Sequence, residues 1–289
     1  NKYAIQRAQD EGMTFIPPYD DELVMAGQGT IANEILRQWR DVEYVFVAVG
    51  GGGLIAGVAA YLGDVAPHVK VIPVEYDESA CLKAALEANE RVILPSVGLF
   101  ADGTAVAQIG EKPFEVIRLQ KSDNSGPIVE PDVVLVNTDE VCAAIKDTYD
   151  ECRSIVEPSG AMALAGIKKY VAEHGIQGKN IVSIVCGANM NFDRLRYIAE
   201  RTELGEHKEA IFAVTIPEEK GAFLNFCRAL QGRNITEFNY RASDATAAQV
   251  FVGISLKSGE KERHDIYELL KTQYDVDDLS DDEVAKLHI

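Results

Sequence analysis

The chain has 289 residues, 47% hydrophobic and 26% charged, a composition typical of a globular protein with one large or two modest domains. A net charge of −18, from 46 acidic against 28 basic residues, argues against a nucleic-acid-binding surface. It favours a small-molecule enzyme of the cytoplasm or of an organelle matrix (plastid or mitochondrion). No apolar stretch is long enough to cross a membrane, and the five scattered cysteines form no CxxC or Cys/His cluster. We therefore expect no membrane partner, metal site or disulfide framework.

The amino-terminal region is predicted to be mainly helical. Its first residues follow a helical pattern that Gly12 ends, and the chain's last nine residues carry no terminal signal, so we expect a fragment at both ends. A short strand and turn are predicted at residues 14–18. A helix is predicted over residues 27–39, with Ile31, Ile35 and Leu36 on its buried face.

The most informative stretch is an apolar run, Tyr44–Val49, followed by four glycines, Gly50–Gly53, and a second apolar run. The first run is typical of a strand buried on both faces of a parallel sheet, and the second predicts a helix. Backbone N–H groups can converge in a glycine loop, and the helix dipole favours negative charge, so the pattern predicts a phosphate site. The glycine spacing is not that of a dinucleotide-binding fingerprint. However, Glu75 ends the next strand, where that fingerprint has an acidic residue, so a nicotinamide cofactor remains an alternative at this point.

Strands and helices then alternate up to about residue 190. Further strands are predicted at residues 69–75, 133–136 and 180–185, and helices at 79–89 (capped by Ser79), from Thr104, at 138–150 (capped by Thr138) and at 159–172. This alternation predicts an α/β fold with a mainly parallel sheet, whose ligands lie beyond the carboxyl ends of the strands. Gly50–Gly53 and Cys186–Asn189 both follow such ends.

The pattern changes after a polar linker at residues 203–209, so we expect two domains, residues 1–204 and 205–289. Strands are predicted at 210–216, 234–241, 249–256 and 274–279, with helices at 221–232 and 263–273. The order β-α-β-β-α-β is that of a ferredoxin-like α+β module. The first helix places Phe223, Phe226, Cys227 and Leu230 on one face, which we expect to be core.

Several motifs, taken in order, resemble the biosynthetic threonine dehydratases (threonine deaminases), pyridoxal-phosphate enzymes of the tryptophan-synthase-β-like fold, fold type II. The resemblance covers essentially the whole chain, and the ordered combination is specific. In the second domain it is to the ACT-like regulatory domain of that family. The matching stretches are Pro17-Pro18, residues 26–30, 49–54, 98–103, 157–161, 186–192, 204–206, 216–221 and 236–241.

The resemblance implies pyridoxal 5'-phosphate as cofactor and assigns two parts of its site. The residues that match the loop whose amides hold the cofactor phosphate are Gly50, Gly51, Gly52, Gly53 and Leu54. Cys186 matches the residue that faces the pyridine nitrogen, where a neutral partner suits β-elimination. Glu157 either lies near the ring or caps the helix that begins at Ser159.

The implied reaction is the dehydration and deamination of L-threonine to 2-oxobutanoate and ammonia, the first step of isoleucine biosynthesis, with L-serine as a second candidate substrate. By the same resemblance, isoleucine is the feedback inhibitor, valine its antagonist, and the protein a homo-oligomer, a dimer or tetramer. We expect the effector site at the loop of residues 217–222, with Arg241 or Asn239 adding a polar contact.

The chain also departs from the family. The Ser-x-Lys-x-Arg-Gly-Ala motif with the Schiff-base lysine, and the asparagine loop near the ring, do not occur here and would precede Asn1. The catalytic lysine is therefore not in this chain. Related serine racemases place a metal at residues matching Glu75 and the position six residues on. Here the second is Cys81, so we expect no metal there.

Two other functions remain open on these residues. The absence of the lysine allows a non-catalytic protein that senses amino acids. A different fold-type-II pyridoxal-phosphate lyase or synthase is the other alternative, against which the regulatory module argues.

Overall fold

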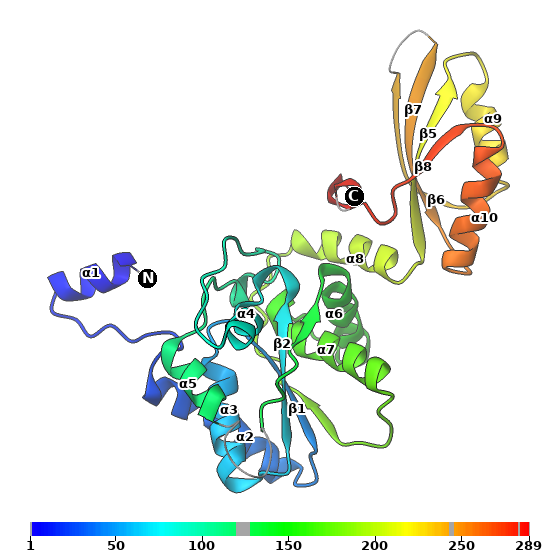
Figure 1. Cartoon of the computed structure of the whole chain (residues 1–289). Coiled ribbons are helices and arrows are strands. Elements are labelled where there is room, and N and C mark those ends of the chain that lie inside the picture. The colour runs from blue at the N-terminus through cyan, green and yellow to red at the C-terminus, as the bar shows by residue number, and fades with distance from the viewer. Residues whose placement is uncertain (1, 120–127, 243–245, 283, 289) are drawn as a thin grey trace. The chain divides into compact units, whose positions relative to one another are not determined.

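The computed structural model describes residues 2–119, 128–242, 246–282 and 284–288. The chain forms two compact units, residues 1–190 and 191–289, which are considered separately below (Figure 1). Within the described residues, no helix is both long enough and apolar enough to span a bilayer.

The first unit is built on a parallel four-stranded sheet with the order β3-β2-β1-β4. Its strands are β1 (Tyr44–Ala48), β2 (Lys70–Tyr76), β3 (Val134–Val136) and β4 (Ile181–Ser183). In the central pair, Tyr44 lies beside Lys70 and Ala48 beside Val74, so both strands direct their carboxyl ends to the same edge. The predicted α/β fold with a mainly parallel sheet is confirmed.

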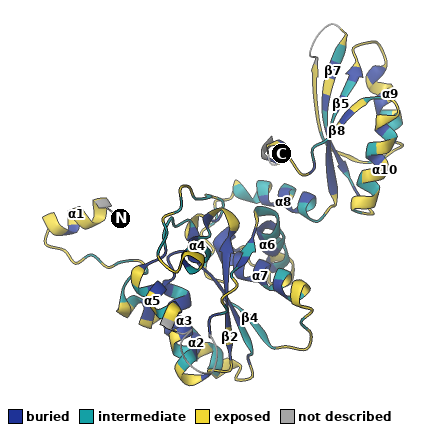
Figure 2. Cartoon of the chain, in the orientation of Figure 1, coloured by how far each residue is buried: buried dark blue, intermediate teal, exposed yellow. Residues whose placement is uncertain are grey.

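Helices cover both faces of this sheet, as Figure 1 shows for α3 and α7. Val45 and Val47 of β1 belong to the core formed with α3, whereas Phe46 packs edge-on against Tyr170 of α7, with ring centroids 5.4 Å apart. Two covered faces explain why the strand sequence is apolar throughout rather than alternating, and Figure 2 shows the buried sheet between its helices. The helices of this unit are α1 (Lys2–Asp10), α2 (Glu22–Gln38), α3 (Gly53–Val65), α4 (Cys81–Ala88), α5 (Glu111–Leu119), α6 (Thr138–Cys152) and α7 (Pro158–His174), with short 3₁₀ turns at Asp77–Ser79 and Asp102–Thr104.

Three features near the amino terminus differ from those predicted. Residues 14–18 form no strand, because Pro17 and Pro18 have no N–H to donate to a ladder. Helix α2 begins five residues before Gly27, at Glu22, since the Asp21 carboxylate caps it by accepting from the Leu23 and Val24 amides. Of its expected buried face, Ile31, Ile35 and Leu36 are only partly buried against the core.

Two further helix starts and one helix cap were also wrong. Helix α4 begins at Cys81, not Ser79, whose hydroxyl caps nothing and is buried without a partner among the described residues. The helix expected from Thr104 begins only at Glu111, where the Asp20 carboxylate accepts from the Glu111 and Lys112 amides. In α6 the cap is Asn137 rather than Thr138: Asn137 and Glu140 form a reciprocal capping box.

The second unit contains an antiparallel sheet with the order β6-β7-β5-β8. Chain order β5-α9-β6-β7-α10-β8 is the predicted ferredoxin-like arrangement, which is confirmed. Phe226 of α9, Leu230 at its carboxyl end, and Ile266 and Leu270 of α10 pack against one face of the sheet. The elements are α8 (Arg194–Gly205), β5 (Glu209–Pro217), α9 (Ala222–Ala229), β6 (Ile235–Ala242), β7 (Ala247–Ser255), α10 (Glu260–Lys271), β8 (Asp275–Asp278) and a 3₁₀ turn at Ala285–His288.

Two details of this unit differ from the sequence analysis. Phe223 is not core: its side chain is 46% exposed, and its ring lies 4.9 Å from that of Phe238 on β6. The segment expected to be a linker at residues 203–209 is helical in its first part, since α8 runs to Gly205, and the boundary between the two compact units falls earlier, after Met190.

Candidate functional site

The glycine loop lies at the carboxyl end of β1 and leads directly into α3. Gly50–Gly53 are all buried, and Gly52 is the N-cap of α3 with φ +88°, a left-handed conformation that favours glycine. Within the described residues, no acceptor is positioned for the amide N–H groups of Gly51, Gly52, Gly53 and Leu54. Several donors therefore converge at the positive end of a helix dipole, the arrangement that binds anions.

Close packing around the loop explains why side chains are absent from it. A Cβ on Gly51 would lie 2.2 Å from the ring of Tyr19, and one on Gly50 would lie 2.9 Å from the Cα of Thr104. A Cβ on Gly52 would lie 2.7 Å from Ile109. Two of the loop carbonyls accept hydrogen bonds. The Gly110 amide donates to Gly51 O and the Ala56 amide donates to Gly52 O, each at 3.0 Å. The loop is therefore fixed while its amides stay free.

The second sequence-predicted site residue, Cys186, is connected to the same edge of the sheet. Its thiol lies 3.6 Å from the carbonyl oxygen of Ser159, at the start of α7. The Ser159 hydroxyl in turn lies 3.3 Å from that of Thr104, the residue against which Gly50 packs. Cys186 follows β4 and the glycine loop follows β1, its neighbour in the sheet. The two predicted parts of the site therefore share one region.

The thiol of Cys186 is held in its neutral form. Desolvation by the surrounding protein raises its pKa above the ordinary value, and the nearby Glu157 carboxylate raises it further. At neutral pH the side chain is therefore a thiol and not a thiolate.

Glu157 occupies the N-cap position of α7, but its side chain does not cap that helix. Instead its carboxylate accepts a hydrogen bond of 2.9 Å from the Asn189 amide, and it packs so closely on Gly187 that a Cβ there would lie 2.0 Å from Oε1. Of the two roles considered for Glu157, helix capping is thus excluded. Its contacts are with the loop that carries Cys186.

Glu75 and Cys81 form a buried cluster behind the glycine loop. Both carboxylate oxygens of the fully buried Glu75 accept amide hydrogen bonds at the start of α4, from Leu82 at 2.8 Å and from Lys83 at 2.9 Å. Burial raises the pKa of Glu75 to about 7, against the lowering effect of these hydrogen bonds. Burial and the Glu75 charge raise the pKa of Cys81 to about 12. The two oxygens of the Glu75 carboxylate are thus hydrogen-bonded to the N-terminal turn of α4.

In the second unit, the loop expected to bind an effector contains only exposed residues between Pro217 and Gly221. Tyr240 on β6 donates a hydrogen bond to the Glu218 carboxylate in this loop. Phe238 and Tyr240 lie opposite Val252 and Val250 of the helix-covered core, so the intervening residues, Asn239 and Arg241, lie on the other face. Arg241 and Asn239 therefore lie on the sheet face opposite to that of Tyr240, whose hydroxyl contacts the loop at Glu218.

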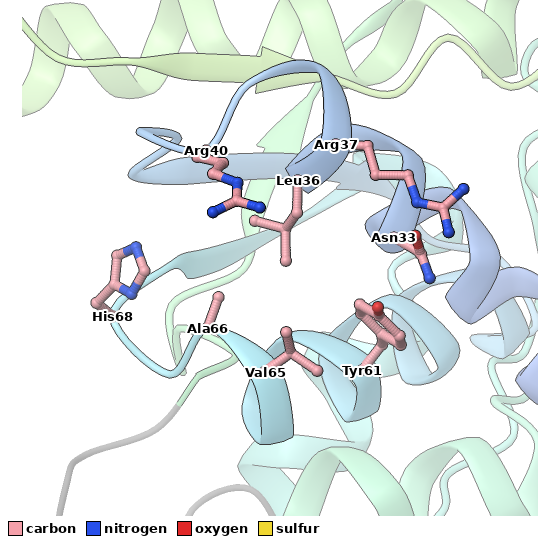
Figure 3. A pocket seen from close by; sticks show the side chains of 8 residues that line it. All are labelled: Asn33, Leu36, Arg37, Arg40, Tyr61, Val65, Ala66 and His68. Carbon is pink, nitrogen blue, oxygen red and sulfur yellow. The ribbon is translucent and has the colours of Figure 1, made fainter.

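A separate surface pocket of about 480 Å³ lies between the carboxyl ends of α2 and α3 (Figure 3). It is lined by Arg37, Arg40 and His68 together with apolar side chains such as Leu36 and Val65. Arg40 precedes β1 and His68 precedes β2, so the pocket lies at the amino ends of these strands. It is thus at the opposite edge of the sheet from the glycine loop.

Tyr19 and Thr104 are site residues that the sequence analysis did not single out. Tyr19 belongs to Tyr19-Asp20-Asp21, in which Asp21 caps α2 and Asp20 accepts from the start of α5, so two helix ends hold its ring over Gly51. An aspartate pair before a helix can be recognised in the sequence as a capping signal. The contact of Tyr19 with Gly51, in contrast, depends on the tertiary fold.

Comparison with known proteins agrees with this geometry. The profile of the family described as pyridoxal-phosphate dependent enzyme matches residues 1–187, and that of the C-terminal regulatory domain of threonine dehydratase matches residues 200–289. The chain is 52% identical over 287 residues to L-threonine dehydratase biosynthetic IlvA of Escherichia coli K12, covering 99% of this chain and 54% of that protein. It is 46% identical to the mitochondrial threonine dehydratase of Saccharomyces cerevisiae, covering 97% of this chain and 50% of that protein.

A solved structure is also similar, that of the processed form of threonine deaminase isoform 2 from Solanum lycopersicum. It superposes with a TM-score of 0.66 at 43% sequence identity, covering 71% of this chain and 54% of that one. The chain thus spans about half the length of the curated relatives it matches. From the profile that covers more than half of it, the chain belongs to the pyridoxal-phosphate-dependent enzymes, and its C-terminal part matches the regulatory domain of threonine dehydratase.

Proposed function

We propose that the protein is a pyridoxal-phosphate-dependent L-threonine ammonia-lyase, which converts L-threonine to 2-oxobutanoate and ammonia at the start of isoleucine biosynthesis. The observation that carries the proposal is the buried glycine loop with unpaired amides at the start of α3, in a chain 52% identical to a protein named biosynthetic threonine dehydratase. Two relatives are named as mitochondrial and chloroplastic threonine dehydratases. We propose that this protein acts in the cytoplasm or in such an organelle, as a homo-oligomer.

In this proposal the amides of Gly50–Gly53 and Leu54 hold the phosphate of the cofactor. The fit is supported by the close approach of Tyr19 to Gly51, which leaves no room for a Cβ, and by the left-handed Gly52, which directs consecutive amides to one side. The dipole of α3 adds favourable charge for a dianion. When bound, the cofactor supplies the electron withdrawal that makes the α-proton of the amino acid acidic.

We assign to Cys186 the position beside the pyridine nitrogen of the cofactor. Because its thiol stays neutral, it can hydrogen-bond the nitrogen without stabilising a positive charge there. Glu157 holds the Cys186 loop through the Asn189 amide, which keeps the thiol at the edge shared with the glycine loop. In the family, the Schiff-base lysine takes the α-proton. None of the lysines in the 289 residues lies in the motif that carries it.

Isoleucine and valine are proposed as effectors of the second unit. The loop of residues 217–222 offers a second helix N-terminus, and Gly221 with φ +92° caps α9 without a side chain. Tyr240 and Glu218 provide a hydroxyl and a carboxylate suited to an ammonium group, while the exposed rings of Phe223 and Phe238 lie nearby for an aliphatic side chain. These contacts support a site for a branched-chain amino acid.

A chimera tests the enzymatic proposal. This chain replaces the matching 287-residue region of the Escherichia coli relative, so that the remainder of that protein supplies the missing segments. We expect the purified chimera to bind pyridoxal phosphate and to release 2-oxobutanoate from L-threonine. A folded chimera that retains the cofactor but forms no 2-oxobutanoate would contradict the assignment, and the same chimera with Gly52→Asp is the matched negative control.

A further inference from the structure

Among the described residues, the side chain of Cys81, which lies outside the glycine loop, is within hydrogen-bonding distance of it. The thiol of Cys81 lies 3.3 Å from the carbonyl oxygen of Gly50, to which it can donate, and it also contacts the Glu75 carboxylate; Cys81 is fully buried. Gly50 is the second residue after β1 and Cys81 the first residue of α4, so this contact joins two residues that are 31 positions apart in sequence.

The position of Cys81 is itself fixed by Glu75. This carboxylate lies at the end of β2 and receives the amides of Leu82 and Lys83, the two residues that follow Cys81. Both carboxylate oxygens are used, so the first turn of α4 cannot rotate or slide without losing a buried hydrogen bond. Because β1 and β2 are paired in register, Glu75 also fixes α4 relative to the strand that carries the glycine loop.

We propose that Cys81 is a positioning residue for the phosphate loop, held in place by Glu75, and that it sets the affinity of this loop for phosphate. In a trans peptide the N–H of Gly51 points opposite to the carbonyl of Gly50, so a hydrogen bond that fixes this carbonyl also fixes the direction of the Gly51 amide. This inference rests on the proposal that the glycine loop holds the cofactor phosphate. A serine would keep the donor at this position, whereas an alanine would remove it at nearly the same volume.

The reason for expecting a functional effect is the fixed geometry of an anion site. Amides bind a phosphate well only when several of them point at one place before binding, because ordering them on binding costs free energy. The Gly110 and Ala56 amides hold the carbonyls of Gly51 and Gly52, but the carbonyl of Gly50 has the Cys81 thiol as its partner within the described residues. Loss of that partner therefore frees the first peptide of the loop.

The experiment compares Cys81→Ala and Cys81→Ser in the 289-residue chain and in the chimera. Binding of inorganic phosphate and of pyridoxal phosphate is measured by titration, and hydrogen exchange of the Gly110 and Ala56 amides reports the order of the loop without ligand. We expect Cys81→Ala to weaken phosphate binding by roughly threefold to tenfold and to speed exchange at both amides, with Cys81→Ser close to wild type. Cys142→Ala, at another fully buried cysteine, located in α6, is the control for general loss of packing.

Each outcome separates this inference from the proposed function. If Gly52→Asp abolishes phosphate binding while Cys81→Ala binds and exchanges like wild type, the loop assignment stands and the role of Cys81 is wrong. If Cys81→Ser is as weak as Cys81→Ala, or Cys142→Ala is equally weak, the effect is one of packing and the inference also fails. If Gly52→Asp leaves binding unchanged, both the loop assignment and this inference are overturned.

Discussion

At the scale of single residues, the site depends on where side chains are absent as much as on where they are present. The ring of Tyr19 packs on Gly51, Thr104 packs on Gly50 and Glu157 packs on Gly187. In each case a Cβ on the glycine would clash with its neighbour. Substitution at these glycines changes backbone positions rather than a single contact. Cys186, by contrast, belongs to an accessible loop, although its thiol lies against the Ser159 carbonyl oxygen.

Gly52→Asp is expected to abolish retention of the cofactor in the chimera. The new Cβ would lie 2.7 Å from Ile109, the left-handed φ of +88° disfavours any side chain, and the added carboxylate repels a phosphate. Retention is measured by the absorbance of the bound cofactor after gel filtration. Gly178→Asp is the control, since Gly178 also has a positive φ but open space around it. Equal retention in both variants would exclude the loop as the phosphate site.

Substitutions at Cys186 should separate a neutral from a charged partner. Cys186→Ser keeps a neutral donor, so we expect activity of the chimera within about threefold of wild type. Cys186→Asp favours a protonated pyridine nitrogen and should lower the rate at least about tenfold while changing the visible absorbance of the bound cofactor. The steady-state rate and the spectrum are measured together. A spectrum that Cys186→Asp leaves unchanged would place the ring away from this residue.

At the scale of elements, the chain uses carboxylates as helix anchors in several places. Asp20 and Asp21 anchor α5 and α2, the pair Asn137 and Glu140 caps α6, and Glu75 anchors α4 from the neighbouring strand. Among these carboxylates, Glu75 is fully buried, and its charge therefore carries a desolvation cost that its two amide partners only partly offset.

Stability should therefore fall as pH rises through the range in which Glu75 ionises. Its pKa in the folded chain is about 7, above the ordinary value of 4.5, so the folded state binds the proton more tightly than the unfolded state. The free energy of unfolding then decreases from about pH 4.5 to pH 7, by up to about 3 kcal/mol from this group. Urea unfolding across this range measures the effect.

The matched variants for this measurement are Glu75→Gln and Glu90→Gln. Glu75→Gln removes the titrating group, so its unfolding free energy should fall less steeply with pH than that of wild type. Glu90 is exposed, and its replacement should leave the slope as in wild type. Parallel curves for Glu75→Gln and wild type would mean that Glu75 ionises normally in the folded chain.

At the scale of the whole molecule, the chain joins two units with different sheets, each with a core of its own. The first offers a loop for an anion at the carboxyl edge of a parallel sheet. The second offers an exposed loop beside a pair of aromatic rings. Feedback inhibition requires a coupling free energy between an effector site and the cofactor site, so it is a property of the assembled enzyme rather than of either unit.

The effector proposal predicts which face of the second sheet binds isoleucine. Gly221→Val strains the left-handed turn before α9, and Tyr240→Phe removes the hydrogen bond to Glu218, so each should raise the isoleucine concentration for half-inhibition of the chimera by roughly tenfold. Arg241→Ala, on the opposite face, should inhibit like wild type. A shift with Arg241→Ala and none with Tyr240→Phe would assign the effector to the opposite face.

Local sequence patterns determined the order of elements and the location of the glycine loop. The apolar run before Gly50 specified a buried strand, the glycines specified the tight loop that leads into α3, and the β-α-β-β-α-β pattern specified the second module, because each depends on periodicity and residue type within a few positions. The motifs also carried the family resemblance, which the profile matches confirm.

Only the tertiary structure decided which side chains meet. The contact of Tyr19 with Gly51, the binding of α4 by Glu75 and the hydrogen bond from Cys81 to Gly50 each join segments that are distant in sequence. Phe223 has the spacing of a core residue, yet it is 46% exposed and its ring lies against that of Phe238. Periodicity assigns a residue to one face of a helix, whereas burial depends on what packs against that face.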